Sequence, residues 1–256
     1  MDIHFTKYHG TGNDFILIDN RSNQVKLSES QIQSLCDRHF GIGADGLILI
    51  EKHKTQDYKM VYYNADGSQS LCGNGSRCGF AFARSLGLAD QTASFETTDG
   101  VHPIKIEDGN IHFGFPDLKN SITLYGEDKY LNTGSPHYIK VVQDVKSLDV
   151  EALGREIRNM SEFSGQNGTN VNFVQLLKGK VKIRTYERGV EAETLSCGTG
   201  ATAVGLVASE YGYDSPVEIE TEGGILTVSY RLEDGFFKNV WLAGPAQKVF
   251  EGTVTI

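Results

Sequence analysis

Leu71-Cys72-Gly73-Asn74-Gly75 and Ser196-Cys197-Gly198-Thr199-Gly200 are the two stretches that determine the fold of this 256-residue chain. They repeat a Cys-Gly-x-Gly sequence at an offset of 125 residues, 197 minus 72. In each case apolar residues at helical spacing follow, and a glycine suited to end a helix comes after them, Gly87 and Gly212. A glycine-rich turn that opens a helix therefore occurs twice.

The sequence around the two turns repeats as well. Strand patterns precede them at 58–63 and 181–186, and Asp-Gly hairpins follow them at Asp108-Gly109 and Asp234-Gly235. The helices themselves are predicted at 73–86 and 198–211, two more helices at 28–36 and 149–160, and other strands at 13–19 and 46–50.

This duplication predicts an α/β chain of the α+β type with two pseudo-symmetric lobes. Each lobe is expected to be a mostly antiparallel sheet or barrel around a central helix. We expect residues 1–117 to form the N-terminal lobe, with residues 245–256 crossing back to it. Residues 118–244 then form the C-terminal lobe, an internal duplication of the first.

Composition excludes several classes of protein. The 24 Lys and Arg against 33 Asp and Glu give a net charge of −9, which argues against a nucleic-acid-binding face. No apolar run approaches the ~20 residues of a membrane span, and the first residues show no signal-peptide pattern. Four cysteines are too few for a disulfide scaffold, so we expect a cytoplasmic protein with free thiols.

The paired turns indicate acid/base chemistry. A cysteine just before a helix lies near unpaired N–H groups and the positive end of the helix dipole, which lower a thiol pKa. The same amides suit a bound carboxylate. Two thiols on opposite sides of one small anionic substrate would remove a proton and return one on the opposite face, which inverts a stereocentre. The alternative is that Cys72 and Cys197 are buried packing residues of a duplicated fold.

Other motifs do not support a cofactor or a metal. Gly41–Gly46 matches G-x-G-x-x-G, but it follows a helix and enters a strand, which is the reverse of the dinucleotide-binding order. The chain has no P-loop lysine, H-E-x-x-H or paired C-x-x-C sequence, so neither a metal nor a nucleotide is expected. A thiol–disulfide redox protein that uses Cys72 and Cys197 is the main alternative from another class.

Four long motifs resemble the diaminopimelate epimerase family, in the family's order and across the whole chain. They are His9–Phe15 (HGTGNDF), Asp37–Gly46 (DRHFGIGADG), Asn64–Gly75 (NADGSQSLCGNG) and Tyr186–Gly200. The resemblance implies a cofactor-independent epimerase that interconverts LL- and meso-2,6-diaminoheptanedioate for lysine and cell-wall synthesis. It also implies two lobes with the site in the cleft between them, in a homodimer.

The resemblance also implies roles for individual residues. Cys72 and Cys197 would be the acid/base thiols, and Glu187 and His137 would assist at the reacting centre. Backbone amides would hold the α-carboxylate, and polar side chains the rest of the substrate. The amides are those of Gly73, Asn74, Gly198 and Thr199, and the side chains are Asn13, Asn64, Asn170, Glu187 and Arg188.

Two positions depart from the family pattern. Ser135 stands where many members have Asn before the Pro-His pair, and Gly46 stands where some have Gln. We assign neither a substrate contact. Within the same fold, a proline racemase-like enzyme is the alternative, since such enzymes also use two thiols on a smaller substrate. The isomerases of phenazine biosynthesis share the fold without the cysteine pair.

Overall fold

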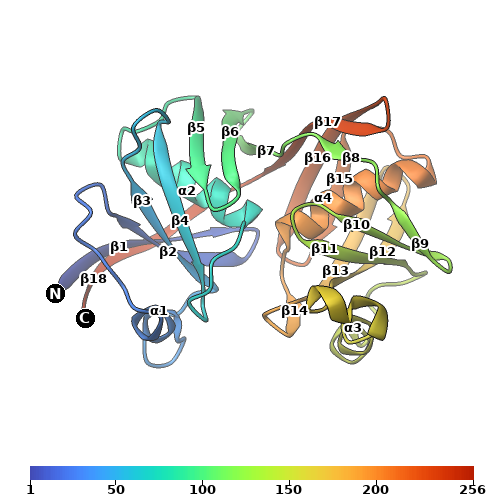
Figure 1. The fold of residues 1–256 in the computed structure, drawn as a ribbon, viewed down its shortest axis with the longest axis horizontal. Coiled ribbons are helices and arrows are strands. Elements are labelled where there is room, and N and C mark those ends of the chain that lie inside the picture. Colours follow the sequence, from blue (N-terminus) through green and yellow to red (C-terminus); the bar gives the residue numbers. More distant parts are fainter. The chain divides into compact units, whose positions relative to one another are not determined.

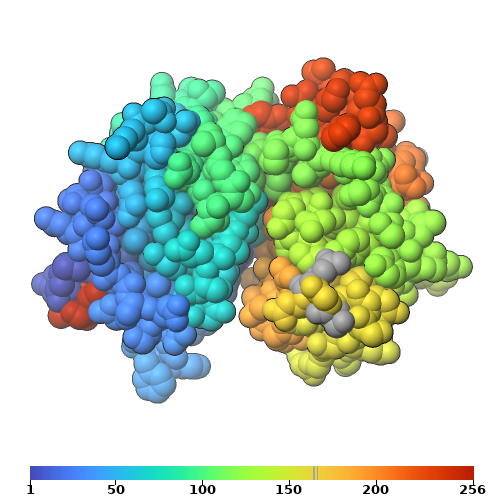
Figure 2. Space-filling model, viewed as in Figure 1, coloured from blue at the N-terminus to red at the C-terminus, as the bar shows by residue number. Residues whose placement is uncertain are grey.

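The computed structural model describes the backbone of residues 1–256 and the side chains of all except Ser164 and Gln166, which are grey in Figure 2. The chain forms two compact units, Met1–Gly114 with Gly244–Ile256, and Phe115–Ala243. Both combine helices with a larger share of strands (Figure 1), so the predicted α+β class is confirmed. None of the helices in the described backbone is long and apolar enough to cross a membrane.

The first unit is a curled sheet of eight strands with two helices. Its strands are β1 (Asp2–Gly10), β2 (Asn13–Asp19), β3 (Gly46–Glu51), β4 (Tyr58–Asn64), β5 (Thr92–Thr97), β6 (Gly100–Glu107), β7 (Asn110–Gly114) and β18 (Gln247–Thr255). They pair in the order β18-β1-β2-β3-β4-β5-β6-β7, parallel for β2–β3 and β4–β5 and otherwise antiparallel.

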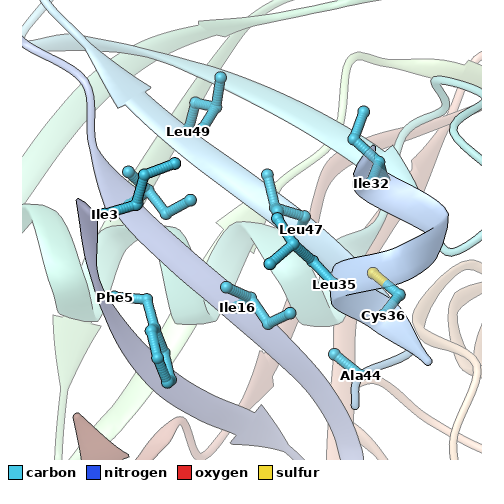
Figure 3. Packing of buried hydrophobic residues seen from close by; sticks show 10 residues of the cluster. Ile3, Phe5, Ile16, Ile32, Leu35, Cys36, Ala44, Leu47 and Leu49 are labelled. Atoms are coloured by element: carbon cyan, nitrogen blue, oxygen red, sulfur yellow. The ribbon is translucent and has the colours of Figure 1, made fainter. Parts of the chain in front are cut away.

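The helices of this unit cover opposite faces of the sheet. Ile16 and Leu47 lie in an apolar cluster under α1 (Glu29–Cys36), as Figure 3 shows. Their neighbour Ile48 points the other way, and its Cδ1 atom lies under the first turn of α2 (Gly73–Ser85). Successive side chains of a strand point to opposite faces, so the middle of β2 and of β3 is apolar on both sides because both faces are covered.

The second unit repeats this plan. Its strands are β8 (Leu118–Lys119), β9 (Thr123–Tyr125), β10 (Asp128–Asn132), β11 (Pro136–Val141), β12 (Asn170–Leu177), β13 (Lys180–Glu187), β14 (Ala192–Thr194), β15 (Val217–Thr221), β16 (Gly224–Glu233) and β17 (Phe236–Gly244). Its helices are α3 (Val150–Arg158), η1 (Ser161–Gln166), α4 (Gly198–Val207) and η2 (Ala208–Tyr211).

Seven strands of the second unit pair in the same order as β1 to β7 of the first. The run β10-β11-β12-β13-β15-β16-β17 is parallel at β11–β12 and β13–β15 and otherwise antiparallel. The α4 helix, whose residues are all buried, packs against most of these strands, as α2 does in its own unit. On the other face α3 lies so close to β13 that a Cβ atom at Gly154 would be 2.3 Å from Cβ of Tyr186.

The predicted helices and hairpins are confirmed, with one difference. The helix predicted at 198–211 ends as α4 at Val207 and continues as the tighter η2 to Tyr211. Gly212, at φ 80°, then ends it in the left-handed conformation that glycine adopts without strain. Both Asp-Gly turns have positive φ at both residues, which is the geometry of a two-residue hairpin turn.

Candidate active site

Cys72 is the N-cap of α2, as its place before the glycine turn predicts. Its Sγ atom accepts a hydrogen bond from the N–H of Gly75 at 3.3 Å. The thiol donates in turn to Oδ1 of Asn13, 3.7 Å away, and Nδ2 of Asn74 donates to the same oxygen at 3.2 Å. The predicted substrate-binding side chain of Asn13 therefore meets one predicted catalytic thiol within the first unit, and the side chain of Asn74, whose backbone amide was the predicted contact, meets it there too.

The carboxylate of Asp45 fixes the orientation of the Asn13 amide. Nδ2 of Asn13 donates to Oδ2 of Asp45 at 2.8 Å, while Arg38 holds the other carboxylate oxygen at 2.7 Å. Because an ionised carboxylate only accepts, the amide oxygen of Asn13 has to face Cys72. Sequence reasoning did not identify Asp45, which belongs to the G-x-G-x-x-G stretch that it set aside.

Arg77 is a second residue that sequence reasoning missed. It is fully buried beneath the turn, where it donates to the carbonyl of Gly73 at 3.3 Å and to Oδ1 of Asn74 at 2.8 Å. Its Nε has no partner, and burial lowers the pKa of the guanidinium to about 10. It still carries a positive charge at neutral pH, close to the N-terminus of α2. The available signal was an arginine in the second turn of the helix, only two residues after the Cys-Gly-x-Gly sequence.

Asn64 and Gly46 lie at the facing ends of β4 and β3. Asn64 accepts from the Tyr62 hydroxyl at 2.9 Å and donates to Ser68 and Ser70, so its amide is held by its own turn. A Cβ atom at Gly46 would lie 2.5 Å from the ring of Tyr62. The lack of a side chain at Gly46 is therefore a packing requirement in this chain.

Cys197 is the N-cap of α4 and is 5% exposed. Its Sγ atom lies 3.6 Å from Oγ1 of Thr199, and that hydroxyl lies 3.0 Å from Nε2 of His137. His137 is fully buried, which lowers its pKa to about 3, with a smaller contribution from the charge of Arg188. The imidazole is therefore neutral at physiological pH and reaches the thiol region through Thr199.

The remaining predicted residues of the second unit form a neighbouring cluster. Nδ2 of Asn170 donates to the Ser135 hydroxyl at 2.8 Å, and its Oδ1 accepts from the backbone N–H of Arg188 at 2.9 Å. Asn170 thus links the ends of three segments of the chain. Glu187, the next residue before Arg188, accepts from the Thr194 hydroxyl at 3.0 Å.

Each turn has the parts needed to hold a carboxylate beside a thiol. The first N–H groups of a helix have no partner within it and attract anions, and in each unit the N-cap residue is the cysteine. The described side chains contain no cluster of three or more His, Cys, Asp or Glu that would suit a metal ion.

Comparison with known proteins assigns the chain to one enzyme type. Residues 5–114 and 129–249 match the family model of diaminopimelate epimerase. The diaminopimelate epimerase of Flavobacterium psychrophilum is 46% identical over 253 residues, which cover 97% of this chain and 98% of that protein. The diaminopimelate epimerase of Aquifex aeolicus is 40% identical over 275 residues, which cover 98% and 97%.

Solved structures share the fold at low sequence identity. A phenazine biosynthesis protein of the PhzF family from Bacillus anthracis has a TM-score of 0.77 at 16% identity, with both chains fully covered. A hydroxyproline epimerase from Agrobacterium vitis has a TM-score of 0.70 at 13% identity, covering 99% of this chain and 92% of that one.

Proposed function

Since the chain belongs to the diaminopimelate epimerase family and interconverts the LL and meso isomers of 2,6-diaminoheptanedioate, we propose that Cys72 and Cys197 carry out the inversion as paired acid/base thiols. One thiolate removes the α-proton while the other thiol donates a proton to the opposite face. The observation that carries this proposal is that each cysteine is the N-cap of the central helix of its unit.

Removal of the α-proton builds negative charge on the carboxylate of the substrate, and the turns are suited to stabilise it. The amides of Gly73 and Asn74 and of Gly198 and Thr199 open the two helices, where partial positive charge is concentrated. The buried guanidinium of Arg77 adds a full positive charge behind the first of these turns. No cofactor is required in this scheme, because the thiols supply both proton transfers.

The polar side chains around the turns are proposed to recognise the rest of the substrate. The planar guanidinium of Arg188 suits the distal carboxylate, and Glu187 suits an ammonium group. Asn13, Asn64 and Asn170 would complete this recognition with amide hydrogen bonds. His137, neutral and bonded to Thr199, would act on the reacting centre through that hydroxyl.

Proton NMR of LL-diaminopimelate in deuterium oxide with the reduced protein tests the proposal. We expect loss of an α-proton signal together with formation of the meso isomer, measured by chiral analysis. Exchange or inversion of proline or hydroxyproline, with none of diaminopimelate, would favour the proline racemase-like alternative instead. Dithiol exchange without any exchange at carbon would favour the redox alternative.

We also propose that the protein acts in the cytoplasm as a homodimer. The four cysteines are free thiols, which a reducing compartment preserves. The β18 strand pairs with β1 along one edge and exposes Val249 (56%), which makes it suitable for contact with a second copy. Sedimentation should give twice the 28.1 kDa chain mass, and Val249→Lys should weaken the association. A native monomer at micromolar concentration would contradict the dimer.

A further inference from the structure

The residues beneath the two cysteine turns occupy equivalent positions but differ in chemistry. In the first unit β3 pairs Ile48 with Tyr62, and in the second β12 pairs Asn172 with Thr185 at the same register. The glycine of each turn confirms the equivalence. A Cβ atom at Gly75 would be 3.4 Å from Cδ1 of Ile48, and one at Gly200 would be 2.5 Å from Oδ1 of Asn172.

The adjacent strand extends the contrast. Phe15 pairs with the first residue of β3 as His137 pairs with the first residue of β12. Phe15, Ile48 and Tyr62 in the first unit, of which Tyr62 has its hydroxyl bonded to Asn64, are thus replaced by the polar His137, Asn172 and Thr185 in the second, and all six are buried. Buried polar groups are costly unless they are hydrogen-bonded, and each of the three polar side chains has such a partner.

The hydrogen bonds of Asn172 determine how its amide is oriented. Its Oδ1 accepts from the Thr185 hydroxyl at 3.0 Å, and its Nδ2 donates to the backbone carbonyl of Tyr138 at 3.1 Å. A carbonyl only accepts, so the nitrogen of the amide has to be on that side. The second hydrogen of Nδ2 is then directed at Nδ1 of His137, 3.2 Å away.

We propose that Asn172 is a positioning residue for the epimerase reaction, which holds His137 as its Nε2–H tautomer and so directs the Thr199 hydroxyl hydrogen to Cys197. Nδ1 accepts from Asn172, and the proton of the neutral imidazole is therefore on Nε2. Nε2 donates to Oγ1 of Thr199 at 3.0 Å, and the hydroxyl hydrogen points away from His137 toward Sγ of Cys197 at 3.6 Å.

This chain of hydrogen bonds favours the thiolate form of Cys197, since a donor to a charged acceptor stabilises the charge. Cys72 instead donates its own hydrogen to Asn13, whose oxygen favours the thiol form. The charges near His137 do not compete for its proton. The charge of Arg188 lowers the pKa of His137, and the carboxylate of Glu187 accepts from Thr194. On the neighbouring strands Lys140 pairs with Asp128 and Arg184 pairs with Glu193. The α4 helix has no charged residue.

The tautomer can be read directly in the unmodified protein. In a long-range ¹H–¹⁵N correlation spectrum of the full chain labelled with ¹⁵N-histidine, we expect a pyrrole-type Nε2 and a pyridine-type Nδ1 for His137, unchanged between pH 6 and 9. The signal that disappears in His137→Gln identifies the residue. A protonated Nδ1, or an imidazolium in this pH range, would overturn the proposal.

The effect on the thiol is measured by peptide-resolved alkylation with iodoacetamide as a function of pH. In Asn172→Asp and in Thr199→Val the midpoint for Cys197 should rise by about one pH unit, while that for Cys72 stays in place. Thr199→Ser should restore the native midpoint. Thr221→Val, which removes a buried hydroxyl bonded to Gly224 elsewhere in the same unit, should leave both midpoints unchanged.

An unchanged Cys197 midpoint in Thr199→Val would overturn the proposal even if Asn172→Asp fails to fold. The inference deepens the proposed two-thiol function and rests on it. Neither measurement uses the substrate, so its failure is distinguishable from failure of the proposed function. An epimerase whose His137 is the other tautomer would refute only the role of Asn172.

Discussion

Cys72 and Cys78 lie on the same helix, yet burial separates their chemistry. Cys78 is fully buried, and burial raises the pKa of its thiol far above the ordinary value. Its counterpart in the second unit is Ala203, also fully buried, as expected for a packing position. Cys72, by contrast, is the N-cap, with a backbone N–H directed at its sulfur. We therefore expect the N-cap thiol, and not the buried one, to be the reactive thiol of this helix.

Replacement of either N-cap cysteine by alanine should abolish epimerisation, because each thiol handles the proton on one face. The readout is formation of the meso isomer from LL-diaminopimelate, with α-proton exchange in deuterium oxide followed in parallel. Cys78→Ala is the matched control, since it removes a buried thiol from the same helix, and it should retain turnover. Near-normal turnover in Cys72→Ala or Cys197→Ala would contradict the two-thiol mechanism.

We expect the buried charge of Arg77 to contribute more to catalysis than to stability. Arg77→Met should lower kcat/KM by about tenfold or more, because the positive charge behind the carboxylate-binding turn is lost. The melting temperature should not fall in proportion, since replacement of a buried charge by an apolar side chain is often neutral or stabilising. Arg84→Met, on the last turn of the same helix, serves as the control. A large loss of stability with unchanged kcat/KM would show a structural role instead.

The carboxylate of Asp14 joins three elements, namely its own strand β2, the strand β1 and the segment after α1. Asp14 is desolvated, which alone would raise its pKa, but hydrogen bonds and ion pairs with Arg38 and Lys7 lower the pKa to about 2. Lys7 is itself buried and also donates to the carbonyl of Gly43. The cluster fixes the segment that carries Asp45, and through it the Asn13 amide.

The stability of this cluster should depend on pH. Because the folded pKa of Asp14 is depressed, its stabilisation is present above the ordinary value near 3.8 and is lost as pH falls to about 2. Asp14→Asn should therefore lower the unfolding free energy at pH 7 by about 2 kcal/mol or more, a difference that narrows below pH 4. Urea denaturation at several pH values measures it.

Asp19→Asn is the comparison for that experiment. Asp19 pairs with Arg21 at 2.7 Å, and both side chains are about one-third exposed. An exposed ion pair contributes about 0–1 kcal/mol, so the loss at pH 7 should be smaller. Two outcomes would show that the buried pairing of Asp14 does not cause the loss of unfolding free energy. One is an equal loss in the two variants, and the other is a loss in Asp14→Asn that persists at pH 2.

Local sequence patterns predict the elements well in this chain and the polar contacts between them poorly. Residues 13–19 form β2 as their β-branched and aromatic composition indicates, and Ser28 caps α1 with Gln31 as a capping box. The contact between Asn13 and Asp45 joins residues that are 32 positions apart. Asn172 and Thr185 meet only when β12 and β13 pair, and nothing local in their sequence marks either as functional.

At the scale of the whole molecule, duplication supplies two similar frameworks whose details have diverged. Both units surround a central helix with strands paired in the same order, and both begin that helix with Cys-Gly-x-Gly. The sequence repeat predicts that common framework. It does not reveal that the residue under one turn, Ile48, is aliphatic while its counterpart under the other, Asn172, is hydrogen-bonded, because nothing in the local sequence marks either residue of its strand. The asymmetry fits a reaction in which the two faces of the carbon need different groups.

Oxidation tests whether the two units bring their thiols to one carbon. Thiols that act on a single α-carbon approach closely enough to be linked, so diamide, which takes up two electrons and two protons, should join Cys72 to Cys197 and abolish activity. Dithiothreitol should restore it. Cys36 and Cys78 provide internal controls, because burial raises the pKa of Cys36 to about 12 and that of Cys78 further still. At neutral pH only a very small fraction of these two thiols is ionised, so diamide should leave both unmodified.

Peptide mapping decides the outcome of this oxidation. A single disulfide between residues 72 and 197, formed in step with the loss of epimerisation, would support a shared site. Full activity after both N-cap thiols are consumed would contradict it, as would disulfides that involve Cys36 or Cys78. Bound substrate should slow the reaction, since it would occupy the space between the two sulfurs. If diaminopimelate slows disulfide formation and lysine, which lacks the second carboxylate, does not, the protein recognises both ends of the substrate.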